Sequence, residues 1–106
     1  MQSAFTGKTA VVTGASAGVG EAVAHAFARQ GANVVLVARR EGPLAAVARA
    51  IEADGGKALE LAMDVCDTAA CERLFERAVE TFGAVHFLIN NAGFHQRGPV
   101  EDNGAA

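Results

Sequence analysis

Four short apolar runs alternate with three amphipathic patterns along the chain, and this alternation limits the possible folds. The apolar runs predict strands, and the patterns with a period of 3.6 residues predict helices. The predicted strands span 8–13, 33–38, 57–63 and 85–90, and the predicted helices span 19–30, about 43–54 and 68–82. Because crossovers between parallel strands are right-handed, this order favours an α/β fold built on a doubly wound parallel sheet.

The helical patterns also predict which residues face the sheet. Gly31 is placed to end the first helix as a left-handed cap, and Pro43 fits the first turn of the second helix. His25 falls on the solvated face of the first helix and is not expected to be a ligand. The residues expected to point inward are Val19, Ala22, Val23, Ala26 and Phe27, then Leu44, Val47, Ala48 and Ile51, then Cys71, Leu74, Phe75, Ala78 and Phe82.

A glycine-rich turn, Thr13–Gly20, joins the first predicted strand to the first predicted helix. Glycines let the backbone come close to a ligand, and the start of a helix offers unpaired N–H groups with a partial positive charge. Such a turn suits a phosphate, although its spacing, G-x3-G-x-G, differs from the G-x-G-x-x-G of the standard dinucleotide fingerprint. A plain strand-to-helix connection is the alternative interpretation of this turn alone.

A second special stretch, Asn90–Gly93, follows the fourth predicted strand. In the usual Rossmann-like topology the strand order is 3-2-1-4, and the ligand crevice lies between strands 1 and 4 at their carboxyl ends. Thr13–Gly20 and Asn90–Gly93 would then flank the same crevice, which favours a nucleotide site over two unrelated turns. We expect the sheet to be truncated after the fourth strand.

The composition is that of one small globular domain spanning residues 1–106. A net charge of −3 argues against a general nucleic-acid-binding protein. No apolar run is long enough to span a membrane, and the N-terminus lacks the charged start and apolar block of a signal peptide. Cys66 and Cys71 suit neither a disulfide framework nor a zinc site, so we expect a cytoplasmic protein without a metal.

The two glycine-containing stretches together carry a family resemblance. Thr13-Gly14-x3-Gly18-x-Gly20, followed by Asn90-Asn91-Ala92-Gly93, resembles the paired motifs of the short-chain dehydrogenase/reductase family. The resemblance covers essentially the whole chain but only the cofactor-binding half of that family's domain. It implies that the cofactor pyrophosphate lies over Gly14, Gly18 and Gly20, its oxygens near Ser16 and Val19, the adenine near Asp64 and Val65, and the ribose near Asn90, Ala92 and Gly93.

Two arginines, Arg39 and Arg40, follow the second predicted strand, where proteins that bind NAD usually carry an acid for the ribose hydroxyls. A guanidinium at this point can pair with a 2′-phosphate, which a carboxylate would repel. The sequence therefore predicts NADP rather than NAD, and the resemblance implies the same. A methyltransferase-like nucleotide fold is the weaker alternative, since such a fold usually holds the ribose with an acid.

The family transfers a hydride between NADP(H) and a carbonyl or alcohol substrate with the help of a tyrosine, a lysine four residues later and a serine. The chain holds no tyrosine, its lysines are Lys8 and Lys57, and its serines are Ser3 and Ser16. No catalytic residue can be assigned, and His95 is expected to be a solvated loop residue. We therefore expect an oxidoreductase segment that is inactive alone and takes a substrate only in a full-length form; a non-catalytic NADP-binding module or sensor is the alternative.

The fourth predicted strand would form an uncovered edge of the sheet that ends in Phe87-Leu88-Ile89. Open edges expose unpaired backbone N–H and C=O groups that can pair with another chain. We therefore expect the isolated chain to form homo-oligomers or to aggregate through this edge.

Overall fold

The computed structural model describes residues 4–64 and 68–91, in which strands and helices alternate as the sequence predicts. The elements are β1 (Thr9–Thr13), α1 (Gly18–Arg29), β2 (Asn33–Ala38), α2 (Glu41–Ala53), β3 (Lys57–Ala62), α3 (Thr68–Phe82) and β4 (Phe87–Ile89). The expected left-handed cap at Gly31 is confirmed, since its φ is 89°. The fourth strand is shorter than the predicted range 85–90.

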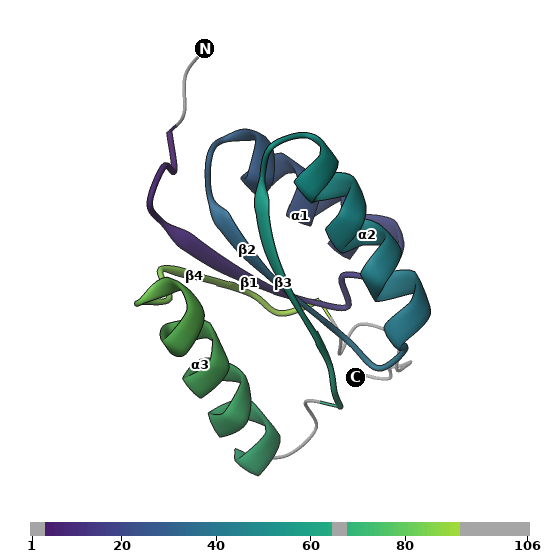
Figure 1. The fold of residues 1–106 in the computed structure, drawn as a ribbon. Helices are drawn as coiled ribbons and strands as arrows, with labels where there is room; N and C mark the ends of the chain where they lie inside the picture. Colours follow the sequence, from purple (N-terminus) through teal and green to yellow (C-terminus); the bar gives the residue numbers. More distant parts are fainter. Residues whose placement is uncertain (1–3, 65–67, 92–106) are drawn as a thin grey trace, which may run out of the picture.

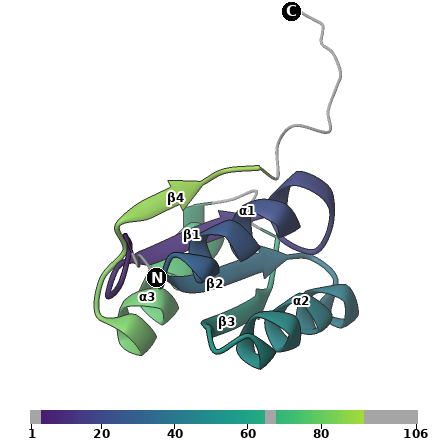
Figure 2. The ribbon, with the colours of Figure 1, turned by 90° about the horizontal axis from the view of Figure 1, so that it is seen from above.

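The four strands form one parallel sheet in the order β3-β2-β1-β4, which confirms the predicted doubly wound topology (Figures 1 and 2). The register aligns Thr13 with Val37, Val12 with Ile89, and Ala38 with Ala62. The carboxyl ends of all four strands therefore lie along one edge of the sheet. The chain order reverses between β1 and β4, which is where ligands bind in open α/β sheets.

Helices cover both faces of the sheet, with α1 and α2 on one side and α3 on the other (Figure 1). The core under α1 and α2 is formed by alternate strand residues, such as Val12 and Leu36, together with Leu44 and Ile51 of α2. The core under α3 contains the intervening strand residues, Val11, Val35 and Val37, with Leu61, Leu74 and Ala78. This division follows from the two-residue period of a strand, because neighbouring side chains point to opposite faces.

The expected inward face of α1 is partly wrong. Its buried residues are Gly20 and Ala24, whereas Val19 is 68% exposed. Ala22 and Ala26, also expected inside, are exposed as well. The physical reason is the close approach of α1 to the end of β1, which only small residues permit and which the apolar period alone does not reveal.

Three aromatic rings and one histidine lie at the amino-terminal end of the sheet. Phe5, Phe27 and Phe87 pack with ring centroids 5.1–5.4 Å apart, which ties the segment before β1 to α1 and β4. The imidazole Nδ1 of His86 accepts the backbone N–H of Thr9 at 3.0 Å, and the backbone N–H of His86 donates to the Thr9 carbonyl at 2.9 Å. These contacts fix β4 beside β1 at the end of the sheet opposite the two motifs.

β4 is hydrogen-bonded to β1 alone within the described part of the chain, as the expectation of an open edge requires. Leu88 is paired in register with Val11 and so lies on the α3 side of the sheet, yet it is 51% exposed. Val79 of α3 is 48% exposed.

Among the helices described, none is both long and apolar enough to cross a membrane.

Candidate dinucleotide site

The turn between β1 and α1 requires glycine at two positions. Gly14 and Gly18 have φ values of 65° and 59°, a left-handed conformation that other residues adopt only with strain. The Ala15 N–H donates to the Val37 carbonyl at 3.1 Å, so the turn is also fixed to the end of β2. The predicted phosphate turn is therefore a defined structure at the carboxyl edge of the sheet.

Gly20 is required for a different reason, which is close packing. A Cβ on this residue would overlap the carbonyl group of Gly14, the first glycine of the turn. Gly20 is buried and lies in the first turn of α1. The absence of a side chain thus brings the start of the helix directly against the end of β1.

The amino terminus of α1 has backbone N–H groups that make no hydrogen bond within the helix. Its N-cap residue, Ala17, is extended, and no side chain of the described residues caps the helix there. The Glu21 N–H bonds back to the Ala17 carbonyl at a long 3.4 Å, and the N–H groups before it have no partner within the helix. Ser16 is half-buried beside this end, and Val19 is exposed there. An uncapped helix start of this kind is a suitable site for an anion.

Thr13 links the two motifs. Its side-chain hydroxyl accepts the backbone N–H of Asn91 at 2.8 Å and lies 3.1 Å from Oδ1 of Asn90 and 3.4 Å from the Ile89 carbonyl, either of which can accept its proton. Thr13 is only 3% exposed, whereas Asn90 is exposed and Asn91 half-buried, so these bonds join the buried end of β1 to the surface. The structure therefore brings the glycine-rich turn and the end of β4 together, as the predicted strand order requires.

Asn91, which the sequence alone does not single out, lies at the same place. Its side-chain nitrogen lies 3.0 Å from the point where a Cβ of Gly20 would stand, which places it beside the first turn of α1. The available signal was its place between Asn90 and Ala92, but two adjacent asparagines gave no means of assigning separate roles.

The remaining predicted residues follow the ends of β2 and β3. Arg39 and Arg40 are exposed directly after β2, and Arg40 is the N-cap residue of α2. Asp64 is exposed two residues after β3, whose end is tied to β2 by the Met63 N–H donating to the Ala38 carbonyl at 2.9 Å. All three thus lie along the same carboxyl edge as the glycine-rich turn. Val65, Ala92 and Gly93 lie outside the described residues.

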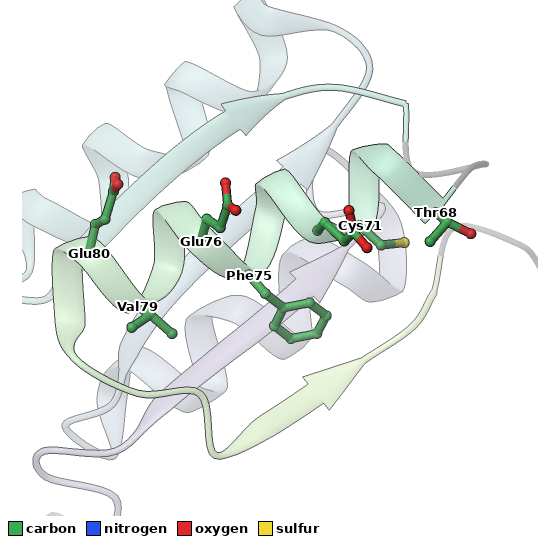
Figure 3. Close-up of a pocket in the computed structure, with 7 residues that line it drawn as sticks. Thr68, Cys71, Phe75, Glu76, Val79 and Glu80 are labelled. Carbon is green, nitrogen blue, oxygen red and sulfur yellow. The ribbon is translucent and has the colours of Figure 1, made fainter.

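Two grooves in the described part of the chain lie elsewhere. The larger, of about 850 Å³, runs along α3, where the ring of Phe75 turns away from the carboxylates of Glu76 and Glu80 (Figure 3). The second lies between α3 and the end of β3 and includes Arg73 and Glu60. Neither contains a predicted cofactor residue. Within residues 4–64 and 68–91, no cluster of three or more His, Cys, Asp or Glu residues could hold a metal ion.

Comparison with known proteins decides the family. The family model described as short chain dehydrogenase matches residues 8–105. The chain belongs to the short-chain dehydrogenase family. It is therefore related to oxidoreductases with a Rossmann-like fold that bind NAD or NADP, as the paired motifs imply.

Members of the short-chain dehydrogenase family match in sequence over nearly the whole chain. A short chain dehydrogenase of Pseudocercospora fijiensis is 43% identical over 95% of this chain, and the ketoacyl reductase HetN of Nostoc is 42% identical over 89%. In each case the match covers 33% of the relative, so the chain spans about a third of the length of these proteins.

Solved structures of the family superpose well. L-sorbose reductase from Gluconobacter frateurii, complexed with NADPH and L-sorbose, has a TM-score of 0.84 and 38% identity over 94% of this chain and 38% of its own. A metagenomic short-chain oxidoreductase in complex with NADP has a TM-score of 0.79 and 42% identity, with 84% of this chain and 40% of that chain covered.

Proposed function

We propose that this chain is the NADP-binding segment of a short-chain oxidoreductase. The observation that carries the proposal is the bond between Thr13 and Asn91, which holds the glycine-rich turn and the end of β4 side by side where the strand order reverses. Family membership supports a dinucleotide as the ligand. The two neighbours whose structures contain NADPH or NADP support the choice of cofactor.

The cofactor pyrophosphate would lie over the turn, where Gly14 and Gly18 keep the backbone accessible and the N–H groups of the first turn of α1 point outward. Ser16, half-buried in the same turn, would donate its hydroxyl to a phosphate oxygen, and the N–H of the exposed Val19 would donate a second bond. The positive end of the helix dipole favours an anion at this point.

Arg39 and Arg40 would hold the 2′-phosphate that distinguishes NADP from NAD. Both are exposed at the carboxyl end of β2, and the bond from Ala15 to Val37 ties that end to the turn. A guanidinium can form two charge-assisted bonds to a phosphate. Asp64 and Val65 would border the adenine, and Asn90, Ala92 and Gly93 the ribose.

In a full-length form the segment would present NADP(H) for hydride transfer to or from a carbonyl or alcohol substrate. The general acid or base of such a reaction needs a titratable group within hydrogen-bond reach of the substrate oxygen. The chain has no tyrosine to fill the role known in the family. We therefore propose that these 106 residues bind the cofactor without turnover.

Titration of the purified chain with NADPH, followed by nicotinamide fluorescence, tests the proposal. We expect saturable binding and no NADPH oxidation with a panel of aldehydes and ketones. A chain that fails to bind NADPH would contradict the proposed cofactor role, and steady oxidation would contradict the proposed lack of turnover.

A further inference from the structure

We propose that His86 makes the pairing of the edge strand β4 with β1 sensitive to pH. The imidazole Nδ1 accepts the backbone N–H of Thr9 at 3.0 Å, directly before the three residues of β4. A ring nitrogen accepts a hydrogen bond only when it carries no proton, so this bond requires the neutral imidazole with its proton on Nε2. Protonation of Nδ1 replaces the acceptor by a donor, which then faces the Thr9 N–H.

The burial of Thr9 makes this change costly. Thr9 has no exposed surface, so water can replace the imidazole only if the imidazole or β4 moves aside. A buried N–H group without an acceptor costs free energy. His86 itself is exposed, so protons from the solvent reach its ring. Histidine is also the side chain whose charge ordinarily changes between about pH 5 and 8.

The charged groups on the elements beside His86 offer no compensation for the lost bond. Lys8, which directly precedes Thr9 in the chain, is exposed and positively charged. Glu80, near the end of α3, is engaged by Arg77 at 3.8 Å. Within residues 4–64 and 68–91, no ion pair involves the imidazole of His86. A protonated ring would therefore lose its bond to Thr9 without gaining a carboxylate partner.

β4 is the element that should loosen first in acid. In the described part of the chain it is hydrogen-bonded to β1 alone, and a side chain bonds backbone at each of its ends. At the far end the partners are the Thr13 hydroxyl and the Asn91 N–H, neither of which titrates near neutral pH. Because the folded chain needs the neutral imidazole, the bond contributes stability above the ordinary titration range of histidine. This contribution is lost as the pH falls through that range.

Urea unfolding of the chain at about pH 7.5 and about pH 5.5 tests the proposal. We expect the unfolding equilibrium constant of the wild-type chain to rise by about fivefold or more between the two values. His86→Asn places an amide oxygen where Nδ1 stands, and this acceptor does not titrate, so most of the rise should disappear. His25→Gln, which removes a histidine of α1, is the matched control and should keep the wild-type pH dependence.

Amide hydrogen exchange locates the effect in the sheet. After correction for the intrinsic exchange rates, protection of the Thr9 and Asn91 amides should fall between the same two pH values by more than that of Val35 in the central strand β2. Equal falls at all three amides would contradict the loosening of β4.

The same pH dependence in wild type and His86→Asn would overturn the proposal. If His86→Asn does not fold, the tautomer of the wild-type imidazole decides. A long-range ¹H–¹⁵N spectrum at about pH 7.5 should show the proton on Nε2. A proton on Nδ1 at that pH would overturn the proposal as well. None of these measurements involves a dinucleotide, so their outcome is independent of the proposed function.

Discussion

The Thr13 hydroxyl accepts the backbone N–H of Asn91 at 2.8 Å, across the point where the strand order of the sheet reverses. Seventy-eight residues of sequence separate the two groups. The bond joins the two motifs on which the proposed site depends, and Thr13, which makes it, is 3% exposed.

Thr13→Val should remove the hydrogen bond between the two motifs without changing the shape of the side chain. The half-buried Asn91 N–H loses its acceptor, which costs about 1–3 kcal/mol of unfolding free energy. Denaturant unfolding of Thr13→Val measures this loss, and Thr13→Ser, which keeps the hydroxyl, is the control. Equal stability of the valine variant and the wild-type chain would show that the bond contributes nothing.

Gly20→Ala should damage the fold because the new methyl group overlaps the Gly14 carbonyl. Backbone must move to relieve the overlap, at a cost of about 1–3 kcal/mol. Gly42→Ala is the matched control, since Gly42 lies in α2 with open space around it and alanine there should be neutral or stabilise by up to about 1 kcal/mol. Thermal melts compare the two, and a tolerated Gly20→Ala would contradict the close approach.

Arg39→Asp should reverse the proposed preference between the two dinucleotides. The carboxylate would repel the 2′-phosphate of NADP and accept the ribose hydroxyls of NAD. We expect NADP binding to weaken by tenfold or more, about 1.4 kcal/mol, with NAD binding unchanged or improved. Arg49→Asp, an equal change of charge at an exposed position later in α2, should leave the ratio of the two dissociation constants near its wild-type value. An unaltered ratio in Arg39→Asp would refute the assignment.

His86→Ala should destabilise the end of the sheet opposite the site. The N–H of Thr9, a residue with no exposed surface, would lose its acceptor at a cost of about 1–3 kcal/mol. Asparagine at this position retains an acceptor oxygen and should recover part of the loss. Urea unfolding followed by circular dichroism measures both variants. A His86→Ala chain as stable as wild type would show that the imidazole is dispensable.

Leu88→Lys should reduce self-association of the chain. Leu88 is half-exposed on the open edge strand β4, and charged residues on an edge oppose pairing with another chain. Sedimentation velocity should show oligomers or aggregates for wild type and a larger monomer fraction for the variant. Val79→Lys, at an exposed position of α3, tests whether the helix face contributes to self-association instead. A wild-type chain that is entirely monomeric would contradict the role of the edge.

The sequence predicted the topology well because each element has a clear period and each helix is followed by a turn signal such as Gly31. Right-handed crossovers indicate the doubly wound sheet, and the usual Rossmann-like topology supplies the strand order, which in turn brings the two motifs together. The face of α1 was less predictable. Val19 fits the apolar stripe predicted for α1, yet it is exposed and Gly20 faces β1 instead. The inward face of α1 depends on the steric contact between Gly20 and Gly14, and that contact is set by the three-dimensional path of the turn.

The candidate site, like the fold, was predictable from the sequence only in part. Glycine spacing indicated the phosphate turn, and the arginines after β2 indicated which dinucleotide to propose. The contacts of Thr13 and Asn91 could not be predicted, because both arise from the pairing of β1 with β4 and neither residue type has a unique partner.

The most direct measurement is a two-dimensional ¹⁵N NMR spectrum of the chain with and without NADP⁺. The account predicts that the largest shifts fall on the backbone amides of 14–20, of Arg39 and Arg40, and of Asn90 and Asn91, with α3 little changed. Shifts centred on the groove along α3, or no shifts at saturating NADP⁺, would contradict a dinucleotide site between β1 and β4.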